Sequence, residues 1–361
     1  MMNAQELHEF PGISAKAFQH SLDLQAIENL GKVPLLNPVL KVVSSTVFER
    51  QMRLTSVSSM VRLGPNQGQS IYNKFVKAAK ILDVPKLPKI YISNRPTINA
   101  YAYGIENYQI VLFSGLIDSM TEEELFSVIG HELGHIKCEH MLYKTTANLI
   151  RLFGLEFIKT LLPIGTGMLA AMPLLLAVLH WERMAEFTCD RAALLVVQDQ
   201  DVVASALSKL AGGSEKILPE INLKEILKQA NEYHDSGNDL LEQIFKVNMM
   251  LMQTHPFPIV RVKEILDWAK DEQYQQILAG DYLLETQASA MAVNSPIGKV
   301  CPNCSQLAKQ SATKCAACGH SLQEARLVCA QCRVKVFSTW QACPNCGNQL
   351  QPDPAEAVLA N

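Results

Sequence analysis

The segment HELGH at positions 131–135 carries residue types that could hold a metal ion and activate water. On a helix, His131 and His135 point within about 40° of each other, so both imidazoles can bind one zinc ion. Glu132 is offset by one residue, so its carboxylate does not complete the ligand set. It can instead take a proton from a zinc-bound water as a general base. A surface helix with two chance histidines is the alternative, and the surrounding sequence has to decide between them.

A catalytic zinc site needs a third protein ligand, and the downstream segment HWERMAEFTCDRAALL offers Glu186. Asp190 follows four residues later on the same helix face and could accept a hydrogen bond from the outer nitrogen of His131. The competing Glu156 has Thr160 at the corresponding position and therefore lacks such a partner. The alternative interpretation is a solvated acidic stripe paired with neighbouring arginines.

His140 is a poorer candidate for the third ligand. It lies five residues after His135, about 140° around the helix. A zinc site of the HExxHxxGxxH class would need histidine at the next position, where the chain has Met141. That class is therefore excluded.

Eight of the ten cysteines form CxxC pairs near the C-terminus. The pairs are Cys301 and Cys304, Cys315 and Cys318, Cys329 and Cys332, and Cys343 and Cys346. Two such pairs make one closed tetrahedral site, so the four pairs predict two structural zinc ions. The repeated CGHSL and CGNQL segments favour two consecutive ribbons, and the module resembles the double zinc ribbon family.

Local patterns predict the elements that position the HELGH segment. Residues 70–84 form an amphipathic pattern typical of a helix, and the runs KIYIS and YQIVLF are typical of short strands. Thr121 followed by Glu124 is a capping box, which predicts that a long helix begins there and carries HELGH. The predicted fold is mainly α with a small β-sheet.

The stretch NAYAYGIENYQIVLFSGLIDSMTEEELFSVIGHELGH, from Asn99 to His135, resembles a zinc metallopeptidase family. This family includes the CAAX prenyl endopeptidases and the HtpX-like proteases. Its members place an Asn-Ala-aromatic-Ala strand and a turn before the HExxH helix, and a later ExxxD supplies the third ligand. The resemblance covers residues 70–265. It implies a gluzincin core with zinc on both HELGH histidines and Glu186, and with Glu132 as the catalytic base.

The resemblance also implies roles outside the helix. Asn99, Ala100 and Tyr101 belong to a strand that is implied to hold an extended peptide substrate by strand addition. His255, in the segment HPFPIVR, is implied to lie near the metal. It could donate to a developing oxyanion or occupy the open zinc position in a resting state, and a loop histidine held by prolines is the alternative. Cys189 stands where the family commonly has alanine, and we interpret it as a small core residue rather than a redox switch.

The length of 361 residues and the 48% hydrophobic content predict about two folded domains. The expected organisation follows from the motifs and from a run of small residues before the first CxxC pair. It comprises an N-terminal helical region (1–69), a zinc metallopeptidase domain (70–285), a linker (286–300), a double zinc ribbon (301–349) and a tail (350–361).

Charge and hydropathy restrict the partners. The net charge is −3, and the ribbons come close to neutrality once zinc thiolates are counted, so no nucleic-acid partner is expected. Residues 160–179 carry no charge, but a single membrane span there would separate HELGH from Glu186. Membrane contact is therefore expected to be peripheral at most. The first residues lack the pattern of a signal peptide, and we expect a cytoplasmic protein, in which disulfides are rare.

These observations together predict a zinc-dependent metalloendopeptidase acting on protein or peptide substrates, with one catalytic and two structural zinc ions. The alternative is a non-enzymatic adaptor with a peptidase-like fold that binds protein partners through its zinc ribbons. An adaptor would not need Glu132, because this residue binds no metal in the scheme above.

Overall fold

The chain forms two compact units, residues 1–283 and residues 284–361. The computed structural model describes residues 7–31, 49–105, 107–145, 147, 168–212, 217, 220–235, 257–288, 299–300, 307–308, 327–328 and 335–336.

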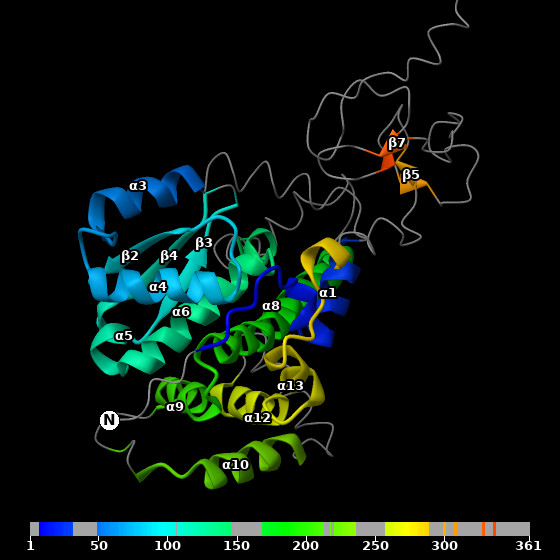
Figure 1. The fold of residues 1–361 in the computed structure, drawn as a ribbon. Helices are drawn as coiled ribbons and strands as arrows, with labels where there is room; N and C mark the ends of the chain where they lie inside the picture. The colour runs from blue at the N-terminus through cyan, green and yellow to red at the C-terminus, as the bar shows by residue number, and fades with distance from the viewer. Residues whose placement is uncertain are drawn as a thin grey trace, which may run out of the picture. The chain divides into compact units, whose positions relative to one another are not determined.

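The first unit combines helices with one small sheet, which confirms the predicted fold class (Figure 1). Its helices are α1 (Ser21–Gly31), α3 (Glu49–Ser59), α4 (Gln69–Ile81), α5 (Ser114–Ser119), α6 (Glu122–Lys137), α8 (Met168–Val197), α9 (Gln200–Ala211), α10 (Leu223–Asp235), α12 (Pro258–Trp268) and α13 (Glu272–Leu278), with a short 3-10 helix at Ala15–Ala17. Its strands are β1 (Val61–Arg62), β2 (Lys89–Ser93), β3 (Ala100–Tyr103) and β4 (Gln109–Phe113).

The helix predicted over residues 70–84 is α4, and the strands predicted from KIYIS and YQIVLF are β2 and β4. The helix ends three residues before the predicted position, at Ile81. Asp83 adopts a left-handed conformation with φ of 49°, and Pro85 follows, so the chain cannot continue as a helix.

The sheet has the strand order β1-β2-β4-β3. Strands β2 and β4 are parallel at its centre, and β1 and β3 pair antiparallel at its edges. Alternate side chains point to opposite faces, so Ile90 and Ile110 join the main core, which also contains Phe75 of α4. Tyr91 and Val111 belong to a smaller cluster on the other face.

Helix α6 begins at the predicted capping box, which the structure confirms. The Thr121 side chain accepts a hydrogen bond from the backbone N–H of Glu124, and the Glu124 carboxylate accepts one from the backbone N–H of Thr121. Glu124 also accepts hydrogen bonds from Lys209 (2.6 Å) and Ser205 (2.7 Å) of α9. The start of α6 is therefore attached to a second helix.

Helices α6 and α8 pack against each other at close range. A Cβ atom added at Gly134 would lie 2.7 Å from the Cβ of Ala192, and one added at Gly130 would lie 2.8 Å from the Cβ of Val196. These glycines are four residues apart on α6, on the face turned to α8. Only residues without a side chain let the two backbones approach this closely.

The second unit contains two antiparallel strand pairs. They are formed by β5 (Lys299–Val300) with β6 (Leu307–Ala308) and by β7 (Leu327–Val328) with β8 (Lys335–Val336). The eight CxxC cysteines lie outside the described residues, so their predicted role as zinc ligands stays a prediction.

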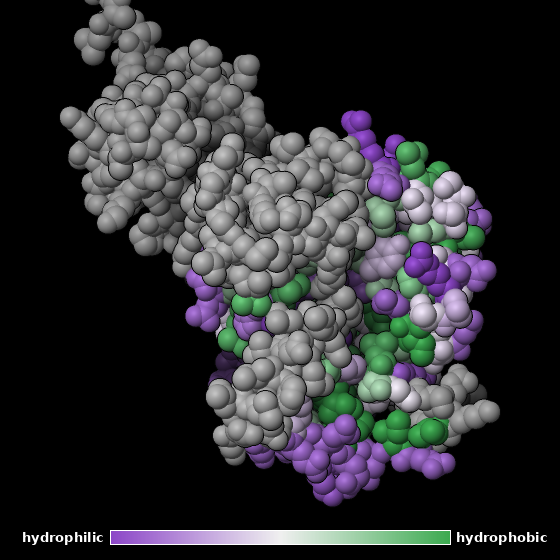
Figure 2. Space-filling model, turned by 180° about the vertical axis from the view of Figure 1, so that it is seen from behind, coloured by the Kyte–Doolittle hydropathy of each residue, from purple (hydrophilic) through white to green (hydrophobic). Residues whose placement is uncertain are grey.

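The described surface of the first unit is chemically mixed. On the face shown in Figure 2, hydrophilic residues line the lower edge and the outer side, and hydrophobic residues gather between them. Within the described ranges, no helix is long and apolar enough to cross a membrane. Residues 160–167 of the uncharged stretch fall outside those ranges.

We expect Gly134→Ala to destabilise the protein by about 1–3 kcal/mol, although alanine stabilises an isolated helix more than glycine does. The added methyl must push α6 away from Ala192 and the backbone of Cys189. Chemical denaturation measures the loss. Gly64→Ala is the control, because no atom lies within 4 Å of a Cβ placed there. Equal stability of both variants would contradict the close contact.

A second prediction concerns acid stability. Burial alone would raise the pKa of Glu124, but hydrogen bonds from Lys209, Ser205 and the backbone of Thr121 outweigh it and lower the pKa. The stabilisation that the Glu124 carboxylate gives the folded protein is therefore complete above the ordinary carboxyl pKa of about 4.3. It is lost as the pH falls through the lower pKa that Glu124 has in the folded state.

We expect Glu124→Gln to lower the free energy of unfolding by about 1–3 kcal/mol at neutral pH and to flatten its decline in acid. Urea unfolding at several pH values measures both effects. The exposed Glu123→Gln is the control on the same helix. An unchanged slope in the Glu124 variant would show that this carboxylate does not contribute.

Candidate metal centre

The three ligands expected from the sequence come together between α6 and α8. The Nε2 atom of His131 lies 3.3 Å from Oε2 of Glu186, and the Nε2 atom of His135 lies 3.2 Å from Oε1 of the same carboxylate. Glu186 is fully buried, and His135 is 1% exposed. Two imidazole nitrogens and one carboxylate therefore meet at a single point, and these are donor types that zinc prefers.

The side chain of Lys144 places a positive charge next to these ligand atoms. The Nζ atom of Lys144 is 2.7 Å from Nε2 of His135 and 3.8 Å from Oε1 of Glu186. Burial alone would lower the pKa of Lys144, but the carboxylates of Glu186 and Glu132 raise it, so the amine is an ammonium ion. The ammonium group thus contacts two of the three proposed ligand residues, and the donor set of all three fits zinc.

The two histidines differ in protonation. Burial and the Lys144 charge hold the pKa of His135 well below its ordinary value, which gives the neutral ring that a metal ligand requires. Burial also acts to lower the pKa of His131, but hydrogen bonds to Asp190 and Glu186 raise it to about 9. Metal binding at His131 would therefore displace a proton.

Glu132 lies next to the proposed ligands. The residue is 4% exposed, and its Oε2 atom has no hydrogen-bond partner among the described residues. Glu132 also lines a cavity of about 590 Å³ that is shared with His131 and Glu186. A buried carboxylate oxygen at the wall of a cavity is suited to bind a small polar molecule there.

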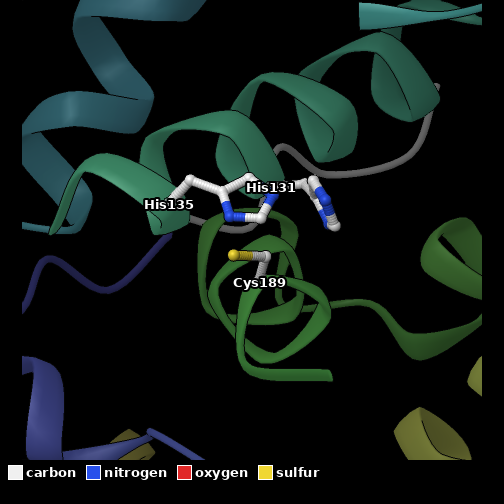
Figure 3. A group of neighbouring side chains, drawn as sticks. All are labelled: His131, His135 and Cys189. Carbon is white, nitrogen blue, oxygen red and sulfur yellow. The ribbon is translucent and has the colours of Figure 1, made fainter. Parts of the chain in front are cut away.

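Cys189 also lies close to the histidines. Figure 3 shows its side chain pointing from α8 toward His135, and one potential ligand atom each of His131, His135 and Cys189 lies within 4.8 Å of the others. Burial raises the pKa of the thiol well above its ordinary value, so the sulfur is protonated in the absence of a metal ion. The sulfur of Cys189 is 3.7 Å from Nδ1 of His140. The carboxylate of Glu186, by contrast, contacts Nε2 of both His131 and His135, which favours Glu186 as the third ligand.

Asp190 lies behind His131, at the position that the sequence suggested. Its Oδ1 atom is 3.1 Å from Nδ1 of His131. Arg261 of α12 donates two hydrogen bonds to the same carboxylate, from Nε (2.8 Å) and from Nη2 (2.6 Å), and its Nη1 is 3.4 Å from Oε2 of Glu186. Burial alone would raise the pKa of Asp190, but Arg261 holds it below its ordinary value. Sequence reasoning gave Arg261 no role, although it is part of the HPFPIVR segment.

Two further residues were missed as parts of the site. His140, rejected above as a ligand, lies with its Nδ1 3.2 Å from Nδ1 of His135. Asp23, which has no motif around it, lies with its Oδ2 3.1 Å from Nε2 of His140. No local pattern connects Asp23 with the HELGH segment, because more than a hundred residues separate them.

The expected substrate strand borders the same cavity. Asn99 and Ala100 line it, together with apolar residues such as Leu116, Leu207 and Phe257. Tyr101 instead packs against aromatic neighbours in the smaller cluster on the other face of the sheet.

His255 and Glu156 lie outside the described residues. The expected position of His255 near the metal therefore stays a prediction.

Comparison with known proteins agrees with the predicted resemblance. The model of Peptidase family M48 matches residues 65–269, and that of the Double zinc ribbon matches residues 301–347. The plastoglobule-localized metallopeptidase 48 of Arabidopsis thaliana is 35% identical over 271 residues, which are 74% of this chain and 77% of that protein. A protease HtpX homolog of Caldanaerobacter subterraneus is 29% identical over 44% of this chain and 62% of its own.

Among solved structures, Ste24p of S. mikatae matches 68% of this chain and 61% of its own, with 16% identity and a TM-score of 0.38. The family model covers more than half of the chain, and the Arabidopsis relative is matched over most of its length. The chain belongs to peptidase family M48, and it carries a double zinc ribbon domain.

We expect Arg261→Met to lower the free energy of unfolding by about 3–5 kcal/mol, because it leaves the buried Asp190 carboxylate without its guanidinium. The double variant Arg261→Met/Asp190→Asn removes the uncompensated charge and should be more stable than the single variant. Denaturation of the wild type, both single variants and the double variant completes a double-mutant cycle. Additive losses would mean that the two residues are not energetically coupled.

Proposed function

We propose that this chain is a zinc-dependent metalloendopeptidase that hydrolyses peptide bonds in protein substrates. The observation that carries the proposal is the meeting of His131, His135 and Glu186 at one point, with Glu132 lining the same cavity as His131 and Glu186. Membership of a peptidase family gives independent support.

His131 and His135 would hold the zinc ion through Nε2, and Glu186 through its carboxylate. When bound, zinc acts as a Lewis acid that polarises the scissile carbonyl and makes water more acidic. Asp190 accepts a hydrogen bond from the Nδ1–H group of His131, which leaves Nε2 of that ring available to the metal. Arg261 holds Asp190 ionised and in place.

Glu132 would act as the general base. It takes a proton from the attacking water and later delivers it to the leaving amine. Its buried Oε2 atom supports this role, because no partner among the described residues competes for the proton. His255 would donate a hydrogen bond to the oxyanion that develops during attack.

Strand β3 would bind the substrate backbone. It is an edge strand that pairs only with β4 within the described sheet, and its first residue lines the cavity. A peptide added to the free edge would extend the sheet and lie in extended form beside the ligands. The apolar side chains of Leu116, Leu207 and Phe257 in the same cavity favour apolar substrate residues near the scissile bond.

The C-terminal cysteines would bind two structural zinc ions, one on Cys301, Cys304, Cys315 and Cys318 and one on Cys329, Cys332, Cys343 and Cys346. The ribbon match supports this assignment. The total would be three zinc ions per chain, and the ribbons would serve to bind a protein partner.

A direct test is Glu132→Gln in the full-length chain. We expect the zinc content to stay at three ions per chain, because the ligands are unchanged, and peptidase activity on an unfolded protein to fall by at least about 10²-fold. Metal analysis and a peptide-release assay measure the two quantities. The exposed Glu123→Gln serves as the control and should retain wild-type turnover.

Wild-type turnover in the Glu132 variant would refute the mechanism. The absence of activity in the wild-type protein as well would favour the adaptor alternative, in which the ribbons carry the function.

A further inference from the structure

A chain of buried polar groups leads from His135 to the N-terminal helix α1. The Nδ1 atom of His135 is 3.2 Å from Nδ1 of His140, and Nε2 of His140 is 3.1 Å from Oδ2 of Asp23. His140 and Asp23 are completely buried. The chain begins at a proposed zinc ligand and ends at a carboxylate from a region to which the sequence assigned no role.

The direction of these hydrogen bonds follows from metal binding. If His135 binds zinc through Nε2, its ring proton is on Nδ1, and this N–H donates a hydrogen bond to Nδ1 of His140. His140 then carries its own proton on Nε2, and that N–H donates a hydrogen bond to Asp23. One carboxylate therefore fixes the tautomers of both rings in the state that leaves Nε2 of His135 free for the metal.

Asp23 is itself held in place from several sides. It accepts hydrogen bonds from Nε1 of Trp181 (2.9 Å), Oγ1 of Thr188 (2.7 Å) and Nε2 of Gln19 (3.0 Å). Trp181 and Thr188 belong to α8, the helix that also supplies Glu186. The carboxylate is thus fixed relative to the proposed third ligand, which is what an orienting group requires.

We propose that Asp23 and His140 are positioning residues of the metal centre, an inference that rests on the proposed function. They orient His135 in the same way that Asp190, held by Arg261, orients His131. Each ligand histidine then has a carboxylate behind it. For His131 this carboxylate is Asp190, which lies one helical turn after Glu186. For His135 it is Asp23 of α1, which acts through the ring of His140. The N-terminal region thereby becomes a part of the metal site.

The test is the zinc affinity of the full-length chain, measured by competition with a chelator. The relevant ion is defined as the zinc that Glu186→Ala lacks, which separates it from zinc held elsewhere in the chain. We expect His140→Phe to bind this zinc about 10–100-fold more weakly, because phenylalanine keeps the ring but accepts no hydrogen bond. His140→Asn should recover most of the affinity, because its amide oxygen can accept the proton of His135.

Ile81→Val is the control for a loss of stability alone. It removes a methylene group from a buried side chain of α4 and changes no group of the imidazole chain, so it should lower the melting temperature and leave the zinc affinity at the wild-type value. Asp23→Asn is a second variant of nearly unchanged size and should weaken zinc binding several-fold, so the test does not depend on the folding of one variant.

Wild-type zinc affinity in both His140→Phe and Asp23→Asn would overturn the inference. An equal loss of zinc affinity in Ile81→Val and His140→Phe would also overturn it, because both effects would then be structural. If Glu186→Ala loses one zinc ion while the His140 and Asp23 variants keep it, only the positioning role fails. If Glu186→Ala keeps every zinc ion, the proposed metal site itself is wrong.

Discussion

The close contact between α6 and α8 is the constraint on which the rest of the site depends. The two histidines and Glu132 come from α6, and Glu186 and Asp190 come from α8, so the separation of the two backbones sets every distance at the site. That separation is possible because Gly130 and Gly134 present no side chain to α8. One of these glycines belongs to the HELGH segment itself, so the same five residues would supply two of the three proposed zinc ligands, the proposed general base and the room for the opposite helix.

The site concentrates buried charge, and this has an energetic consequence. Glu132, Glu186 and Asp190 are all buried, and a buried carboxylate is costly unless it is paired. Arg261 pairs with Asp190 and contacts Glu186, while Lys144 stands among the ligand atoms. A divalent ion between His131, His135 and Glu186 would supply further positive charge at the place where the negative charge is greatest. Metal binding and stability of the fold are therefore coupled in this account.

The sequence was informative where the physics is local. The capping box at Thr121, the amphipathic helix before the sheet and the two central strands depend on neighbouring residues, and all were predicted. The four-residue spacings within HELGH and between Glu186 and Asp190 define helix faces, so each pair could be recognised without knowing the fold. The match of the chain to peptidase family M48 confirms the family resemblance that these motifs carried.

The sequence did not predict contacts between residues that lie far apart along the chain. Asp23, Arg261 and Lys144 reach the site only through the packing of α1, α12 and the segment after α6, and no spacing rule marks them. His140 was judged only as a possible metal ligand, because its angle on the helix says nothing about what lies behind His135. The end of α4 was missed by three residues, because a left-handed residue at Asp83 is not visible in a periodic pattern.

Anomalous scattering at the zinc absorption edge, recorded from crystals of the full-length wild-type protein, would locate the catalytic metal ion directly. We predict a peak within bonding distance of Nε2 of His131, Nε2 of His135 and the carboxylate of Glu186, with the ammonium group of Lys144 displaced from His135. A peak bonded to the sulfur of Cys189 in place of Glu186, or no peak between α6 and α8, would contradict this prediction.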